Sequence, residues 1–410
     1  MFFRLHACNR MGYFSESERL MVPLVERFQQ EAGGSFEKII AAAYFIICFA
    51  DYFIHRRELD YLQKHFLRLK TAAQGMFDYS RKVKSLETLT KDGVNSIENN
   101  YIRGSHLYDM IVLIHAMTQY AYLARCIGIF GEELKFNKEI ERLGDVLTRE
   151  LAAAGISPET ANEDRRRGKK SLLRKIITEK PVVGRAPAHD QFFAYLLYGG
   201  YPFQCGTLDR GMMKQAVAVC DRVYDGLPLY LKSLGGWDVP LSLVHAVNLL
   251  LLGDPRFHET VSRFFEVGGE RLMLPSRVNP KTGMGVGGDG DSAAAMAMLF
   301  SLLRCMMFMD FEDHLSVFPC PREEWFQPGK EIVVEDAPSR FGPINFRVTS
   351  SSNEVLFRFT ELPKFNPPEI RFQLPFKAKI KDDSDFIIKK VVGNVYVING
   401  WPSAVRFLKP

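Results

Sequence analysis

The sequence predicts a mainly helical domain followed by a smaller β domain. Hydrophobic residues recur at the helical period of about 3.6 from Ser15 to Asp310. After Phe318-Pro-Cys-Pro the period changes to two, which is typical of strands. The length of 410 residues can hold two such units. We therefore expect a helical domain over residues 1–318 and an antiparallel β-sandwich over residues 319–410.

About ten helices are predicted in the first part. The first opens with Ser15-Glu-Ser-Glu, which supplies an N-cap and an acidic first turn. Consecutive helices can pair into hairpins around a ring, an (α/α) toroid, or pack as a bundle, and periodicity does not separate the two. The predicted ranges are 15–30, 36–53, 58–81, 104–127, 137–154, 190–198, 210–231, 240–252, 256–265 and 289–309.

About seven short strands are predicted in the second part. Apolar and polar residues alternate over 344–349, 354–360, 369–374 and 393–398. Turn signals rich in Pro, Gly, Asn and Asp separate these runs at spacings near ten residues. This pattern favours a small antiparallel sandwich.

Composition excludes several classes of protein. The chain has 47% hydrophobic and 25% charged residues, which is typical of a globular protein and excludes disorder and collagen. Its 53 basic and 48 acidic residues leave a net charge of +5, which predicts neither a nucleic-acid nor a membrane partner. The basic run from Arg165 to Lys170 lacks interleaved aromatic residues, so we interpret it as a solvated linker.

The apolar stretches and the cysteines point to an intracellular protein. Charged or polar residues such as Asp51 and Arg125 interrupt the two longest apolar stretches, 39–53 and 111–129, which favours buried helices over membrane spans. The N-terminus shows no signal-peptide pattern. The seven cysteines are odd in number and form no CxxC pair, so we expect reduced thiols and a cytoplasmic location.

No motif predicts a metal or a cofactor. The nine histidines include no HExxH pair, and no GxGxxG follows a predicted strand. A helical prenyl-chain enzyme is disfavoured because no DDxxD-type magnesium motif is found.

Three motifs occur in order between Val278 and Arg347. The acidic loop Gly287-Gly-Asp-Gly-Asp-Ser opens a helix of small residues, a proline-rich step leads to Trp325, and Pro338-Ser-Arg-Phe-Gly begins the strands. This stretch resembles the last helical hairpin and the following sandwich of the six-hairpin glycosidase-like proteins. The resemblance implies an (α/α)6-type toroid followed by a C-terminal β-sandwich. It also implies that the protein acts on carbohydrate. A complete ring has twelve helices and about ten are predicted, so we expect a short or incomplete toroid.

Hydrolysis of a glycosidic bond requires a protonated carboxyl group and a second carboxylate. In a toroid, such residues come from loops at one end of the ring, so acids that precede helices are the strongest candidates. The predicted catalytic candidates are Asp289, Asp291, Asp238 and Glu98. The predicted substrate-binding candidates are Trp237, Asn100, Tyr101, Asp109, His189 and Asp190.

Each candidate also has a structural interpretation. Asp238, Asp289 and Asp291 precede helices and are suited to N-capping. Glu98 is suited to a solvated loop, and Asp109 and Asp190 to a cap or a satisfied buried polar group. For Asp51, inside an apolar helix, a structural hydrogen bond is favoured over an acid of raised pKa.

Two functions therefore follow from the sequence. The first is a glycosidase-like hydrolase that acts on an oligo- or polysaccharide by carboxylate acid/base chemistry, without metal or cofactor. The alternative is a non-catalytic carbohydrate-binding or interaction scaffold built on a degenerate toroid.

Overall fold

The computed structural model describes most of the chain. The described residues are 2–30, 36–84, 102–153, 197–201, 210–223, 227–231, 235–268, 274–286, 290–361, 363–381 and 386–410.

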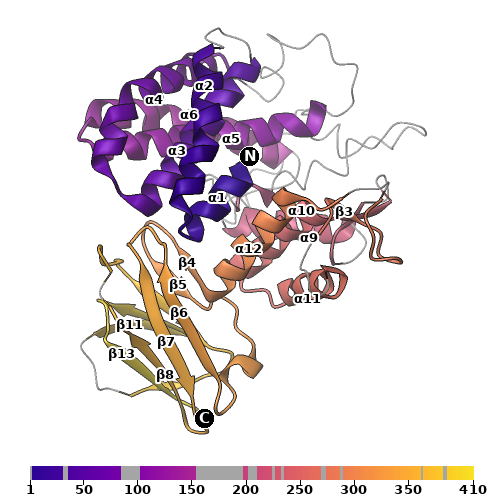
Figure 1. The fold of residues 1–410 in the computed structure, drawn as a ribbon, viewed down its shortest axis with the longest axis vertical. Helices are drawn as coiled ribbons and strands as arrows, with labels where there is room; N and C mark the ends of the chain where they lie inside the picture. The colour runs from indigo at the N-terminus through magenta and orange to yellow at the C-terminus, as the bar shows by residue number, and fades with distance from the viewer. Residues whose placement is uncertain are drawn as a thin grey trace.

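A helical ring and a β-sandwich make up the molecule (Figure 1). Five described helices line the inside of the ring and pack side by side in the order α5, α3, α1, α12, α10. These inner helices are α1 (Phe2–Arg10), α3 (Phe36–Arg56), α5 (Ile102–Cys126), α10 (Val239–Leu252) and α12 (Ala293–Met307). They are rich in apolar residues because both their inner and outer sides are covered.

A second layer of amphipathic helices covers the inner ones. α2 (Phe14–Gln30) packs on α1 and α3, and α4 (Leu59–Ser80) packs on α3 and α5. α6 (Phe130–Ala153) packs on α5, while α9 (Arg210–Val223) and α11 (Phe257–Gly268) pack on α10. Inner and outer helices therefore alternate along the chain, which is the arrangement of an (α/α) toroid and not of a simple bundle.

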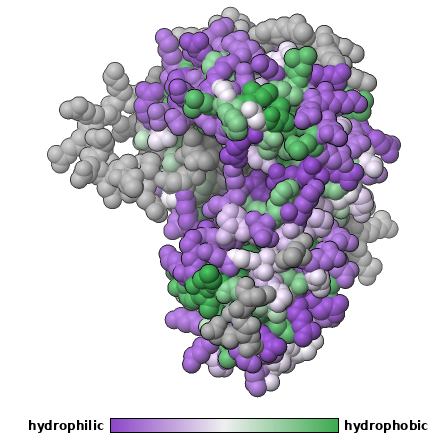
Figure 2. All heavy atoms as spheres, turned by 90° about the vertical axis from the view of Figure 1, so that its left-hand side faces the viewer, coloured by the Kyte–Doolittle hydropathy of each residue, from purple (hydrophilic) through white to green (hydrophobic). Residues whose placement is uncertain are grey.

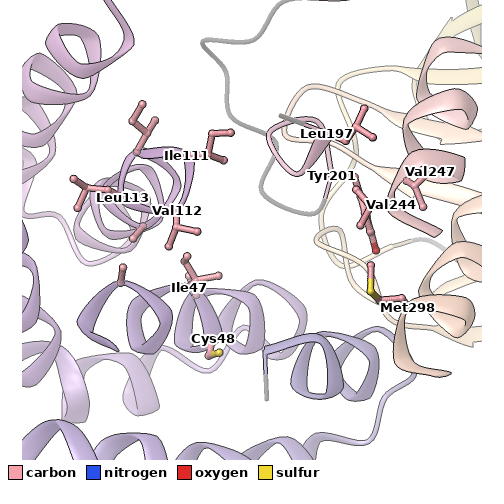
Figure 3. Packing of buried hydrophobic residues seen from close by; sticks show 14 of the residues in the cluster. Ile47, Cys48, Ile111, Val112, Leu113, Leu197, Tyr201, Val244, Val247 and Met298 are labelled. Carbon is pink, nitrogen blue, oxygen red and sulfur yellow. The ribbon is translucent and has the colours of Figure 1, made fainter. Parts of the chain in front are cut away.

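A short turn at residues 197–201 joins the two ends of this arc. The ring of Tyr198 contacts Tyr108 of α5 at a centroid distance of 5.2 Å. On the other side, Asn248 of α10 donates a hydrogen bond of 2.8 Å from Nδ2 to the carbonyl oxygen of Leu197. Leu197 and Tyr201 accordingly lie beside Val244 and Val247 in Figure 3, with the apolar residues of α3 and α5 opposite.

The inner helices share one direction, with their C-terminal ends toward the sandwich. Arg57, directly after α3, donates to the carbonyl oxygen of Arg340, and Arg125 near the end of α5 pairs with Glu312 at 2.6 Å. Arg304 in the last turn of α12 pairs with Asp310 at 3.0 Å. The beginnings of these helices consequently lie at the opposite end of the ring.

The sandwich consists of two five-stranded sheets. One has the order β10-β13-β8-β7-β6, and the other has the order β11-β12-β9-β5-β4. All pairs are antiparallel except β5 and β9, which run parallel with Leu315 opposite Ile370. The strands are β4 (Phe308–Asp310), β5 (Leu315–Val317), β6 (Glu331–Ala337), β7 (Ile344–Ser350), β8 (Glu354–Phe359), β9 (Ile370–Gln373), β10 (Lys379–Ile380), β11 (Ile387–Val392), β12 (Val395–Asn399) and β13 (Ala404–Leu408).

Aromatic residues fill the space between the two sheets. Phe357 of β8 contacts Phe372 of β9 at 5.0 Å and Phe407 of β13 at 5.6 Å between ring centroids. Phe318 contacts Phe346 and Phe357 from the connection that leads out of β5. These rings bury the apolar faces that the alternating pattern predicts.

Several elements differ from the sequence-based expectation. α1 was not predicted, because its nine residues are too few to show a period. α9 ends at Val223, and Tyr230–Leu231 forms the strand β1 instead of a helix end, since Pro228 cannot continue a helix. β4 and β5 precede the period change near Phe318; because they are short and largely buried on both faces, no alternation marks them. The division of the chain at residue 318 stays a prediction.

The thiols and the apolar helices lie mostly inside the protein. The six described cysteines are free, and Cys48, Cys220, Cys305 and Cys320 are buried; Cys205 lies outside the described residues. Among the described helices, the window Lys38–Arg56 is long and apolar enough to cross a membrane, but 72% of it is buried inside the protein. The face in Figure 2 is largely hydrophilic, with hydrophobic side chains in separate patches.

Candidate active site

The end of the ring where α5, α10 and α12 begin carries the four sequence-predicted residues that the structure describes, namely Asp109, Trp237, Asp238 and Asp291. Asp238 directly precedes α10, and Asp291 lies two residues before α12. Asp109 lies in the first half of α5. Six predicted residues lie outside the described residues, namely Glu98, Asn100, Tyr101, His189, Asp190 and Asp289.

Residues 274–278 connect the beginnings of α10 and α12. In this segment β3 (Arg277–Val278) pairs with β2 (Gly236–Asp238), so that Trp237 faces Val278 and Asp238 faces Arg277. Pro275 forms an isolated bridge with Asp291, and the amide of Ser292 donates to the carbonyl oxygen of Leu274 at 2.8 Å. The structure therefore brings Trp237, Asp238 and Asp291 to one small β ladder.

Asp238 is the N-cap of α10. Its Oδ1 accepts a hydrogen bond of 2.9 Å from the amide of Leu241, and Pro240 occupies the first turn, where a missing N–H costs nothing. Burial raises the pKa of this carboxyl above its usual range, although the bond from Leu241 and the charge of Arg277 oppose the shift. Asp238 therefore caps α10 through Oδ1, as the structural interpretation predicts. Its second oxygen, Oδ2, takes no part in this capping bond.

Asp291 is not the cap of α12. The hydroxyl of Ser292 accepts the capping bond from the amide of Ala295 at 3.3 Å, so Ser292 is the N-cap. The side chain of Asp291 is exposed. Its carboxylate is therefore not required to begin the helix.

Trp237 is half-buried and packs against the ring core. Its indole meets Phe264 of α11 edge-on, at 6.4 Å between centroids and an angle of 82°. Part of the indole is therefore structural, and stacking on a sugar stays a prediction for the remaining surface.

Asp109 has the most perturbed carboxyl group among the described candidates. Burial raises its pKa to about 7, so that about half of these groups carry a proton at neutral pH. It lies near the phenol of Tyr44 from α3, whose pKa is raised by burial and by Tyr108 and Asp109. The hydroxyl groups of Tyr44 and Tyr108 are 2.5 Å apart. A buried carboxyl group with this pKa can donate a proton near neutral pH.

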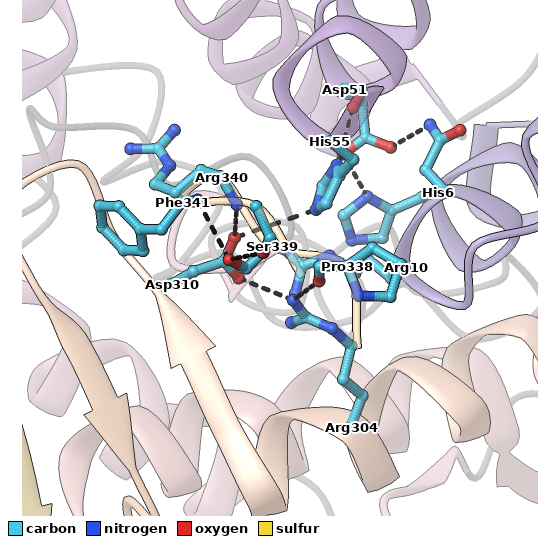
Figure 4. A network of polar contacts seen from close by, with 12 residues as sticks. His6, Arg10, Asp51, His55, Arg304, Asp310, Pro338, Ser339, Arg340 and Phe341 are labelled. Carbon is cyan, nitrogen blue, oxygen red and sulfur yellow. Dashed lines mark hydrogen bonds and ion pairs between the residues drawn. The ribbon is translucent and has the colours of Figure 1, made fainter. Parts of the chain in front are cut away.

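A second polar cluster, which we call the junction network, lies at the opposite end of the inner helices (Figure 4). His6 Nδ1 of α1 lies 2.8 Å from Asp51 Oδ1, and Asn9 donates to Asp51 Oδ2 at 2.6 Å. His55 Nδ1 donates to the carbonyl oxygen of Asp51 at 2.8 Å, and its Nε2 lies 3.9 Å from Asp310 of β4. His6, Asp51, His55 and Asp310 border a small cavity of about 50 Å³.

The acids of the junction network are held ionised. Burial alone would raise the pKa of Asp51, but His6, His55 and Arg10 together hold it below its usual range. Burial opposes ionisation of Asp310 too, and Arg304, Arg10 and His55 outweigh it, so that its pKa is also lowered. The expected structural hydrogen bond of Asp51 is therefore present, and the network joins ring to sandwich instead of supplying an acid catalyst.

Comparisons with known proteins bear on the fold. No protein-family model matches the sequence, and no curated protein matches it. The chain is similar in structure to the α-L-rhamnosidase from Dictyoglumus thermophilum, with a TM-score of 0.50 and 9% identity over 90% of this chain and 39% of that one. The chain shares its fold with this glycoside hydrolase.

Two further α-L-rhamnosidases show weaker likeness. The enzyme from Streptomyces avermitilis, complexed with L-rhamnose, gives a TM-score of 0.48 and 10% identity over 90% of this chain and 32% of that one. The enzyme from Aspergillus terreus gives a TM-score of 0.49 and 8% identity over 98% of this chain and 45% of that one. The chain thus spans less than half the length of these proteins. At these identities the likeness concerns the fold alone.

Sequence reasoning missed the tyrosines around Asp109. Tyr44 and Tyr108 lie within apolar helical patterns, where an aromatic residue is predicted to belong to the hydrophobic core. Only the packing of α3 against α5 brings their hydroxyl groups together. Among the described residues, no group of three or more His, Cys, Asp or Glu side chains is arranged to hold a metal ion.

Proposed function

We propose that the chain is a glycoside hydrolase-like protein that cleaves a glycosidic bond in an uncharged oligo- or polysaccharide. The observation that carries the proposal is Asp109 of the inner helix α5, a carboxyl group whose pKa burial raises to about 7, so that it retains its proton up to nearly neutral pH. The gathering of Asp238, Trp237 and Asp291 at the beginnings of the inner helices supports it. The small net charge of +5 suits an uncharged sugar better than a polyanion.

In the proposed reaction Asp109 is the general acid. It donates its proton to the glycosidic oxygen as the bond to the anomeric carbon breaks, and the leaving sugar departs as an alcohol. Water adds to the anomeric carbon and releases a proton to a carboxylate. Asp291, exposed and free of the capping role, is assigned to that second group, with Asp289 and Glu98 as the remaining sequence candidates. Asp238 is assigned to positioning, because its carboxyl group caps α10.

Asp109→Asn is expected to reduce kcat/KM by about 10²–10⁴-fold on phenyl glycosides, because it removes the proton donor at almost constant volume. A much smaller loss is expected on 2,4-dinitrophenyl glycosides, whose leaving group does not need protonation. The wild-type rate on phenyl glycosides is expected to fall above pH 7, as Asp109 loses its proton. Activity is measured by phenol release over a panel that includes α-L-rhamnosides.

Asp145→Asn is the control for this experiment, since Asp145 is an exposed acid on the outer helix α6. It is expected to leave both rates unchanged. Equal losses of Asp109→Asn on the two leaving groups would contradict the assignment of Asp109 as general acid.

A non-catalytic carbohydrate-binding scaffold is the second candidate. Two of the predicted site residues have structural roles, which favours this candidate. Asp238 caps α10, and Trp237 packs against Phe264. Calorimetric binding of an oligosaccharide without release of reducing ends would support it.

We also propose a cytoplasmic location. The free state of the six described cysteines, four of them buried, supports it.

A further inference from the structure

A second cavity, distinct from the candidate active site, lies where the ring meets the sandwich. Its volume is about 480 Å³, within the usual range of small-molecule sites. The ring contributes Arg210 and Met213 of α9 together with the last turn of α10, and the sandwich contributes β4, β5 and β9. Because the inner helices share one direction, this junction cavity and the beginnings of α10 and α12 lie at opposite ends of the ring.

The ionisable groups of the junction cavity are all basic. Arg210, His314 and Arg371 line it, and no Asp or Glu is among its described lining residues. Arg371 pairs with Glu369 at 3.0 Å and with Asp313 at 3.6 Å, and Asp313 also lies 2.7 Å from His314 Nδ1, but neither acid is part of the wall. The lining therefore presents hydrogen-bond donors to an occupant from both the ring and the sandwich.

Arg210 is fixed in place but not neutralised by a carboxylate. Its Nη1 and Nη2 donate to the carbonyl oxygens of Leu251 and Leu252 at 3.3 and 2.7 Å. These bonds use two of its five N–H groups, and no ion pair to it is found among the described residues. A guanidinium held in this way is pre-organised for a carboxylate, which takes two parallel hydrogen bonds from it.

The rest of the cavity wall is mainly apolar. Met213 and Leu250 line it from the ring, and Met309 lines it from β4. Phe311 is stacked on His314, with 4.4 Å between the ring centroids and an angle of 15°, so both rings are held in place. An occupant therefore needs an apolar body as well as an anionic end.

We propose that the junction cavity binds a small organic acid. Its carboxylate pairs with Arg210 and Arg371, and its apolar body packs against Met213, Leu250 and Met309. Such a molecule contacts ring and sandwich at once, so it also strengthens their association.

The test uses 4-phenylbutyrate as the probe and 4-phenylbutan-1-ol as its uncharged analogue, with binding measured by calorimetry on the full chain. The acid is expected to bind at least tenfold more tightly than the alcohol. Arg210→Gln is expected to weaken binding of the acid at least tenfold, since it removes the charged donor of hydrogen bonds to the carboxylate. Arg347→Gln, an exposed arginine of β7 paired with Glu331, is the matched control and is expected to change nothing.

A second variant keeps the test decisive if Arg210→Gln fails to fold. Ser316→Phe fills the cavity from β5 without removing either arginine, and it is expected to abolish binding. The proposal is overturned if the acid does not bind, if the alcohol binds equally well, or if Ser316→Phe binds the acid as wild type does.

Discussion

Replacing Asp310 by asparagine is expected to lower the free energy of unfolding by about 3–5 kcal/mol, the usual cost of breaking a buried ion pair from one side. The side chains of Asp310 and Arg304 are only 2% and 8% exposed and lie 3.0 Å apart. Asp310 also accepts a hydrogen bond of 2.9 Å from the amide of Arg340. Its loss of charge leaves the buried guanidinium group of Arg304 without its paired carboxylate, and it removes one of the two carboxylates, Asp310 and Asp51, that face Arg10.

Urea unfolding followed by circular dichroism measures this effect. Asp313→Asn, three residues further along, is the matched control, because the carboxylate of Asp313 is 72% exposed. A loss below about 1 kcal/mol is expected there. If both variants lost the same free energy, the junction network would not be what holds the ring to the sandwich.

Stability is expected to fall steeply as the pH drops from about 6.5 toward 4. Burial lowers the pKa of His55 and of His258 to about 4, and that of His115 to about 3. In the unfolded chain these groups bind protons near pH 6.5, so between the two values the unfolded state holds more protons. The stabilisation by neutral histidines is therefore complete above pH 6.5 and is lost as the pH falls.

The titration of Asp109 has the opposite effect on stability over the same pH range. Its pKa of about 7 means that the folded state binds its proton before the unfolded state does, so stability rises as the pH falls from 7 toward 4. Burial also lowers the pKa of His6, His65 and His314, and it raises that of Asp238. Because the histidines of lowered pKa outnumber the acids of raised pKa among the described residues, the free energy of unfolding is expected to fall between pH 6 and pH 5, by about 1.4 kcal/mol per pH unit for each net proton that the unfolded state binds in excess.

Urea titrations at half-unit steps from pH 7.5 to 4.5 measure this slope. His55→Gln is expected to flatten it by about 1.4 kcal/mol per pH unit, since one titrating group is removed. A stability that is constant or rises between pH 6 and pH 5 would contradict the neutral, buried state of these histidines.

Local sequence patterns predicted the long elements well. The ranges of α3, α4 and α5 were expected to within a few residues, because each is an apolar or amphipathic helix of more than twenty residues. The strands β7 and β8 alternate clearly, and they lie where expected. α1 and β4 were not predicted, since short elements are specified by their packing partners and not by a period.

The candidate site was predictable only in part, for a physical reason. Acids that precede helices are visible in sequence, and this led to Asp238 and Asp291. The pKa of Asp109 depends instead on burial beside Tyr44, which is 65 positions away in the chain and on another helix. The junction network likewise joins His6, Asp51 and Asp310 from three distant segments, and no local pattern encodes that meeting.

The shared direction of the inner helices makes the two ends of the ring electrically unlike. Aligned peptide dipoles place partial positive charge where α5, α10 and α12 begin, and partial negative charge at the sandwich. Arginines oppose the negative end: Arg10, Arg125 and Arg304 lie in the last turns of α1, α5 and α12. α10 has no basic residue in its last turn, and Arg210 of α9 donates to its carbonyl groups instead. At the opposite end of the ring, burial raises the pKa of Asp109 in α5, so the two ends differ in their ionisable groups as well as in their helix dipoles.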